Sequence, residues 1–229
     1  MEDFAGVAEN VARIRRDIEE CLDRSGRSGE MVTIVAVTKT FPVEAVRAAI
    51  WAGLTEIGES RIQESASKKP EVDLECRWHL IGHLQKNKIN KALELYDFIQ
   101  SVDSLTLASE INKRADRIID ILLQVNSSGE ETKYGMSPYA LIDTARQIAK
   151  LDKIRIKGIM TIGPLTDDMS QTRHSFKLTK QIFDELRDAD IPNTDIQYLS
   201  MGMTSDYRLA VEEGSNMIRI GTAIFGERG

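Results

Sequence analysis

The chain alternates between amphipathic stretches and short apolar runs over most of its length. From about residue 3 to residue 24, apolar side chains recur three and four positions apart, which predicts one amphipathic helix. Residues 32–39, VTIVAVTK, form a short apolar run rich in β-branched residues, which predicts a strand buried on both faces. Pro42 is then expected to open a helix at its first turn.

Seven further strand-like runs follow the first one along the chain. They are TEIGES, RWHLIG, DFIQSV, DILLQVN, RIKGIMTIG, IQYLSMG and MIRIGTAIFG. Helical patterns such as VEAVRAAIWAG and RHSFKLTKQIFDELRDA separate them, and the links are short, as βα units prefer. Eight strands in βα order predict an α/β fold, a closed (β/α)8 barrel of the TIM type with an extra N-terminal helix. A doubly wound open sheet is the alternative.

Length, charge and residue composition argue against several classes of protein. The 229 residues are expected to form a single domain, 1–229, because the last predicted strand ends close to the end of the sequence. A net charge of −6 gives no support for nucleic-acid binding. The acidic N-terminus and the absence of an apolar run near 18 residues argue against a signal peptide and a membrane span. Two distant cysteines are compatible with a reducing cytoplasm. A monomer is expected, because the predicted helices leave no apolar stripe over for a partner.

Lys39 ends the first predicted strand. Alternation places it on the same face as Val35 and Val37, and barrels carry their functional groups at the carboxyl ends of their strands. Partial desolvation lowers the pKa of an amine there, and a neutral amine can form a Schiff base with an aldehyde. The alternative is that Lys39 extends from the strand end into water.

The segments after strands seven and eight carry groups that bind anions. SMGMTSDYRLA supplies Thr204, Ser205 and the start of a helix, and IRIGTAIFG supplies Gly221 and Thr222. Backbone N–H groups and hydroxyls in this place favour a phosphate, which barrels often bind with these two loops. By itself, MTSD is also an ordinary helix cap.

Other polar residues admit two interpretations each. Arg219 lies within an apolar strand and needs a partner, either a barrel carboxylate such as Glu59 or a ligand atom. Met203 is either core filler or a contact for an aromatic ring. His79 and His83 are four residues apart, but the first is on a strand and the second in a loop, so no metal site is expected.

Together these motifs resemble one known family. AVTKT, GESRIQE with Glu59 and Glu64, WHLIGHLQKNK, VNSSGEETKYG, GIMTIG, SMGMTSD and IRIGTAIFG look like the pyridoxal phosphate homeostasis proteins, the YggS/PROSC family. The similarity runs from about residue 32 to residue 226 and keeps the order of the motifs. The family is a single-domain relative of the alanine racemase barrel, so the resemblance implies pyridoxal 5′-phosphate (PLP) as the cofactor.

The resemblance also implies a role for each matching residue. Lys39 would form the Schiff base with the cofactor aldehyde, and Arg219 would face the pyridine nitrogen. The phosphate would be held by Thr204, where the family usually has serine, together with Ser205, Gly221 and Thr222. Met203 and Ser60 complete the expected cofactor-binding set. Two positions depart from the family pattern, because Ser60 stands where asparagine is common and Asn216 where threonine is usual.

These expectations lead to one functional hypothesis and two rivals. The hypothesis is a cytoplasmic PLP-binding protein that buffers the cofactor or hands it to PLP-dependent apoenzymes, without robust catalysis. An arginine facing the ring nitrogen keeps it unprotonated, which makes the ring a weaker electron sink. The rivals are a weak PLP-dependent amino acid racemase, with Tyr134 or His79 as acid or base, and a lysine Schiff-base aldolase acting on a sugar phosphate.

Overall fold

The strands of the protein close into a barrel in the computed structural model, which describes residues 4–130 and 132–227. Within the described residues, eight parallel strands follow one another in chain order, and β1 pairs with both β2 and β8. The strands are β1 (Thr33–Val37), β2 (Glu56–Glu59), β3 (Arg77–Leu80), β4 (Phe98–Val102), β5 (Ile119–Val125), β6 (Ile154–Thr161), β7 (Thr194–Ser200) and β8 (Met217–Ile220). The closure confirms the predicted (β/α)8 barrel and excludes the open sheet.

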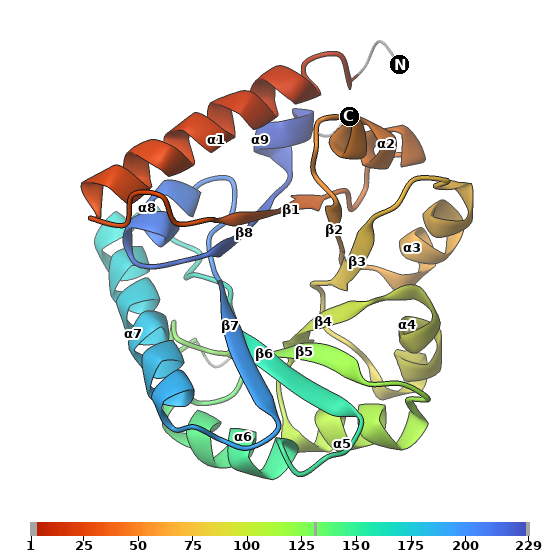
Figure 1. The fold of residues 1–229 in the computed structure, drawn as a ribbon, viewed down its shortest axis with the longest axis vertical. Coiled ribbons are helices and arrows are strands. Elements are labelled where there is room, and N and C mark those ends of the chain that lie inside the picture. The colour runs from red at the N-terminus through yellow and green to blue at the C-terminus, as the bar shows by residue number, and fades with distance from the viewer. Residues whose placement is uncertain (1–3, 131, 228–229) are drawn as a thin grey trace.

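Helices surround the barrel on its outer side (Figure 1). They are α1 (Val7–Arg24), α2 (Val43–Trp51), α3 (Ile62–Lys68), α4 (Ile89–Leu95), α5 (Leu105–Arg114), α6 (Leu141–Ile148), α7 (Met169–Asp188), α8 (Tyr207–Glu212) and α9 (Thr222–Phe225). Helices α2 to α8 each connect one strand to the next, whereas α1 precedes β1 and packs beside α8 and α9. In the part of the chain that the structure describes, we find no helix with the length and apolar character needed to cross a membrane.

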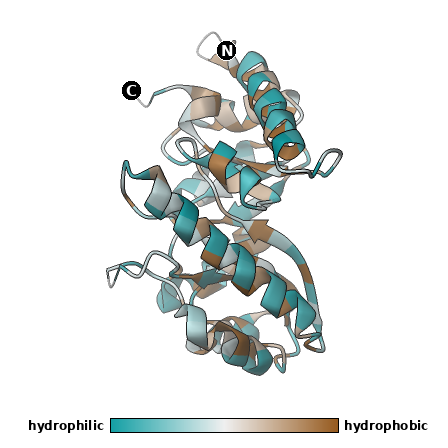
Figure 2. Cartoon of the chain, turned by 90° about the vertical axis from the view of Figure 1, so that its left-hand side faces the viewer, coloured by the Kyte–Doolittle hydropathy of each residue, from teal (hydrophilic) through white to brown (hydrophobic). Residues whose placement is uncertain are grey.

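Apolar side chains form two layers, one on the outer face of the barrel strands and one on the inner face. A large cluster, which includes Ile34 and Ala36, lies between the barrel and its helices. A smaller cluster contains the intervening Val35 together with Phe98, Leu122, Met160 and Met217, and it fills the barrel interior. The long helices α1 and α7 therefore bury one side and carry hydrophilic residues on the other, as Figure 2 shows. Val35 thus marks the inward face of β1, the face predicted to carry Lys39.

Two predicted boundaries differ from the observed ones, and one helix was not predicted. Helix α1 begins at Val7, later than predicted, and residue 3 lies outside the described residues. Pro42 precedes α2 as its N-cap residue, with an extended ψ of 174°, so the first helical residue is Val43. Helix α3 was not predicted, because its short sequence IQESASK shows no clear apolar period.

The end of the last predicted strand is wrong as well. Strand β8 stops at Ile220, and the residues TAIF form the short helix α9. The reason is Gly221, whose φ of −111° and ψ of −87° leave the extended conformation. Helix α9 docks on the start of the chain, where the Asn10 side chain donates to the Ile224 carbonyl at 2.9 Å. The turn places Gly221 and Thr222 at the carboxyl end of the barrel.

Candidate functional site

A cavity of about 300 Å³ opens at the carboxyl ends of β1, β7 and β8, the end at which such barrels carry their sites. Its lining consists of Val37, Lys39, Ile81, Met203, Thr204, Ser205, Arg219, Gly221 and Thr222. Seven of the eight residues that the sequence analysis expected at the cofactor thus lie around one cavity. The apolar Val37 and Ile81 were not predicted as part of it.

Ser60, the eighth expected residue, lies outside this lining and follows β2. It packs against the loop after β3, where a Cβ atom added to Gly82 would come within 2.4 Å of the Ser60 carbonyl oxygen. Only glycine allows these two loops to approach so closely. Because Ile81 beside Gly82 does line the cavity, Ser60 supports the cavity wall through its backbone.

The backbone is fixed on both sides of Lys39. The carbonyl of Thr38 accepts a hydrogen bond from the Lys68 amine at 2.8 Å, and the amide of Thr40 donates to the Glu64 carboxylate at 2.7 Å. Thr40 has a φ of 66°, an uncommon conformation for a residue other than glycine. The half-buried Lys39 is therefore held at the cavity by contacts from α3, which the sequence did not reveal.

A buried ion pair lies behind this turn. Lys68 donates to Glu59 Oε1 at 2.7 Å, and the Thr38 hydroxyl donates to the same oxygen at 2.7 Å. Glu59 Oε2 is buried without a hydrogen-bond partner among the described residues, and burial raises the pKa of Glu59. The sequence analysis did not predict this pair.

Arg219 does not pair with Glu59, so that part of the prediction is wrong. Its Nη1 donates to the carbonyl and hydroxyl of Ser200 at 2.9 and 2.8 Å, and its Nη2 donates to the Thr161 carbonyl at 2.7 Å. Burial lowers the pKa of Arg219 to about 10, while the charge of Asp206 opposes the shift. The guanidinium thus remains protonated at neutral pH and presents N–H groups to the cavity.

The loops after β7 and β8 meet at the cavity. The Thr204 hydroxyl oxygen accepts a hydrogen bond from the Ala223 amide at 3.3 Å, which joins the two loops. Asp206 shapes the first loop by accepting from the Met203 amide at 2.6 Å. The hydroxyl hydrogen of Thr204 is left to donate to a ligand, because the oxygen serves Ala223 as acceptor.

The histidines take other positions. His79 is completely buried in the barrel interior, where it contacts Glu56 and Gln100, as expected for an inward residue bound by hydrogen bonds. His83 stacks on Tyr134, with ring centroids 3.8 Å apart. Over residues 4–130 and 132–227, no three His, Cys, Asp or Glu side chains are grouped as metal ligands would be.

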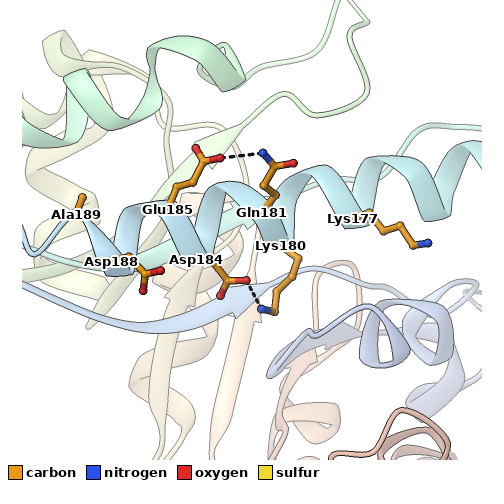
Figure 3. A pocket seen from close by; sticks show the side chains of 7 residues that line it. All are labelled: Lys177, Lys180, Gln181, Asp184, Glu185, Asp188 and Ala189. Carbon is orange, nitrogen blue, oxygen red and sulfur yellow. Dashed lines mark hydrogen bonds and ion pairs between the residues drawn. The ribbon is translucent and has the colours of Figure 1, made fainter.

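A larger hollow of about 670 Å³ runs along α7 (Figure 3). Its lining comes from residues 177–189 of this one segment, and the side chains pair with one another along the helix. Lys180 pairs with Asp184, and Gln181 donates to Glu185 at 2.8 Å. Ligand sites draw their polar groups from several elements, so we interpret this hollow as a solvated helix face.

The fold and the cavity define a barrel of the alanine racemase class, and the family model for the alanine racemase N-terminal domain matches residues 10–229. The chain belongs to the family of pyridoxal phosphate homeostasis proteins within this class. The family member of Pasteurella multocida (strain Pm70) is 36% identical over 228 residues, which cover 97% of each chain. This membership confirms the resemblance seen in the motifs.

Two solved structures support the same assignment. A crystal structure of an unknown protein from Bifidobacterium adolescentis has a TM-score of 0.92 and 38% identity, covering 97% of this chain and 96% of its own. PipY of Synechococcus elongatus PCC7942, solved with PLP bound, has a TM-score of 0.83 and 35% identity, covering 96% and 100%. The PLP belongs to that second structure.

Proposed function

We propose that this protein binds PLP in the cavity at the ends of β1, β7 and β8, and that it holds the cofactor and hands it on. The observation that carries the proposal is the meeting of Lys39 with Thr204, Ser205 and Thr222 around one cavity. An amine and a group of hydroxyls, far apart in sequence, thus face the same space. The relatives named as PLP homeostasis proteins and the PLP-bound PipY support this function.

The donors around the cavity fit the three polar parts of PLP. When bound, PLP supplies an aldehyde that bonds reversibly to amines, a pyridine ring that withdraws electrons, and a phosphate. Lys39 is the amine that binds the aldehyde, and Arg219 is the N–H donor for the ring nitrogen. Thr204, Ser205 and Thr222 are the hydroxyl donors for the phosphate.

The space beside Gly221 agrees with the assignment of the phosphate to this end of the cavity. A Cβ atom added there would meet the Val37 carbonyl oxygen at 3.4 Å, an ordinary contact, so the packing of the protein itself does not require glycine. The space beside the Gly221 backbone belongs to the cavity. We infer that glycine serves the close approach of the phosphate to the backbone amides at the start of α9.

A carrier explains the cavity better than a racemase does. Racemisation needs a proton donor or acceptor on each face of the substrate carbon. Among the described residues of the lining, Lys39 and Arg219 are the ionisable ones, and a pKa of about 10 keeps Arg219 protonated. The rival candidates His79 and Tyr134 lie outside the lining. Lys39 alone is left to exchange protons, so we favour release of the cofactor by exchange of one amine for another.

The test is to add PLP to the purified protein, record the visible absorbance, reduce with borohydride and map the modified peptide. We expect a visible band and a modified Lys39. Lys39→Ala should lose the band but keep weaker binding through the phosphate loops. Lys180→Ala, which changes a lysine on α7 outside the cavity, is the matched control and should behave as the unchanged protein.

Four results would contradict parts of this proposal. A protein that takes up no PLP is not a carrier, and a colourless protein in which borohydride traps a sugar phosphate on Lys39 is the rival aldolase. Modification of another lysine removes Lys39 from its role. Deuterium incorporation into the α-position of an amino acid, at a rate above that of free PLP, would support the racemase.

A further inference from the structure

A continuous chain of hydrogen bonds crosses the barrel interior from the cavity to the opposite end. Arg219 Nη1 on β8 contacts Ser200 Oγ at the end of β7 at 2.8 Å, and Ser200 Oγ contacts Gln100 Oε1 on β4 at 2.7 Å. Gln100 Nε2 lies 2.9 Å from His79 Nδ1 on β3, and His79 Nε2 contacts the Glu56 carboxylate at the start of β2. Five strands of the barrel contribute one residue each.

The two ends of the chain and the orientation of the Gln100 amide together determine the direction of every hydrogen bond in it. Arg219 can only donate, and the Glu56 carboxylate can only accept. Ser200 therefore accepts from Arg219 and donates to Gln100, whose amide then donates to His79 Nδ1. His79 must be neutral with its hydrogen on Nε2, and burial lowers the pKa of His79 in agreement with this. All donors thus point from the cation towards the carboxylate.

Burial makes this arrangement rigid. Ser200, Gln100 and His79 have no exposed surface, so no water competes for their hydrogen bonds. Because the Ser200 hydrogen is committed to Gln100, the hydroxyl oxygen presents its lone pairs to Arg219. The other bonds of Arg219 go to backbone carbonyls, so Ser200 Oγ is the side-chain contact that fixes the guanidinium among the described residues.

We propose that Ser200 and Gln100, anchored through His79 on Glu56, are positioning residues that orient Arg219 towards the ring nitrogen of the cofactor. The proposal rests on the function proposed above, in which Arg219 faces the PLP ring. It assigns a role to residues that lie outside the cavity lining and would otherwise be regarded only as packing in the barrel interior. Aligned hydrogen bonds in a dry interior strengthen one another, so the chain favours one orientation of Arg219.

The experiment compares Ser200→Ala, Gln100→Leu and the double variant, each loaded with PLP. Each single change breaks the same chain, so we expect a shifted visible band and about five-fold weaker PLP binding in each, the scale of one net hydrogen bond. The double variant should be no weaker than either single one, because an interrupted chain cannot be interrupted twice. Ser200→Thr retains the hydroxyl and should restore the band.

Ser65→Ala is the matched control, since it removes a buried hydroxyl that bonds to Tyr96 on the outer side of the barrel. Its apo protein should lose as much thermal stability as Ser200→Ala, but its bound PLP should keep the band of the unchanged protein. An unchanged band and affinity in both Ser200→Ala and Gln100→Leu would overturn the proposal. Losses of affinity that add up in the double variant would overturn it as well.

A second measurement separates this proposal from the proposed function. Nitrogen NMR of the apo protein should show His79 with its hydrogen on Nε2, and Gln100→Leu should change the Nδ1 signal. If the unchanged protein fails to bind PLP, the proposed function fails while the tautomer still confirms the chain. If PLP binds but His79 carries its hydrogen on Nδ1, the direction of the chain is wrong and the positioning role falls.

Discussion

The barrel closes differently at two of its seams. Between β5 and β6 the backbone ladder runs through seven register pairs, from Ile119 opposite Ile154 to Val125 opposite Thr161. Between β7 and β8, by contrast, only the pair Ser200 and Met217 is in register among the described residues. The cavity lies beside the second seam, so the ligand site occupies the place where backbone pairing is least extensive.

Polar side chains reinforce the β7–β8 seam, where backbone hydrogen bonds such as that from the Met201 amide to the Met217 carbonyl at 3.1 Å lie beyond the one register pair. The Ser215 hydroxyl lies 2.8 to 3.1 Å from the carbonyl oxygens of Leu199, Met201 and Met217. Asn216 accepts from the Leu199 amide at 2.8 Å, so this departure from the family pattern belongs to the seam and not to the cavity lining.

The largest expected effect comes from breaking the core at the β5–β6 seam. Leu123 is fully buried on β5 between the barrel and its helices. Leu123→Ala should lower the free energy of unfolding by about 2–5 kcal/mol, because a cavity replaces packed methyl groups. PLP affinity of the folded protein should stay unchanged, since Leu123 does not line the site. Denaturant unfolding and PLP titration measure the two quantities.

Leu93→Ala is a suitable control, because Leu93 is only half-buried on α4 and should cost less stability. If the fully folded Leu123→Ala variant instead bound PLP more weakly, the β5–β6 and β7–β8 seams would be energetically coupled. The contrast drawn between the two seams would then be wrong.

An intermediate effect is expected from the side chains that reinforce the β7–β8 seam. Ser215→Ala leaves the Met201 carbonyl without this donor, and leaving a buried polar group unsatisfied costs about 1–3 kcal/mol. Because the change lies between β7 and β8, we expect unfolding stability and PLP affinity to fall together. Unfolding with and without PLP measures both. A loss of stability with unchanged affinity would show that the seam does not shape the cavity.

The same contrast explains what the sequence could predict. The ladder strands and Lys39 followed from local patterns, because period-two apolar runs define strands and a lysine at a strand end is visible in the chain. The two phosphate loops followed from glycine and hydroxyl residues after strands seven and eight. PLP itself, the contact of Arg219 with the ring nitrogen and the place of Ser60 at the cofactor came only from the resemblance. The roles of the site residues remain predictions.

Contacts across the barrel were beyond local patterns. Of the two expected partners of Arg219, the carboxylate of Glu59 is wrong, because a strand sequence shows an arginine but not the carbonyl groups of Ser200 and Thr161 that surround it. The contacts of Arg219 depend on which strands become neighbours in the closed barrel, and that is set by register and not by periodicity. The burial of Lys68 against Glu59 was not predicted either.

The smallest expected effect tests whether the loop after β7 contributes to binding the phosphate. Thr204→Ala removes one hydroxyl at the tip of β7 and should weaken PLP binding by about 1 kcal/mol, the net worth of one hydrogen bond. Stability should change little, because the Ala223 amide that bonds to Thr204 belongs to a half-buried residue in the first turn of α9, where water can replace the hydroxyl. Thr106→Ala, an exposed change on α5, is the matched control and should leave the affinity unaltered. Equal affinity in both variants, measured by titrating the visible band, would remove Thr204 from the site and leave Ser205, Thr222 and the backbone amides to bind the phosphate.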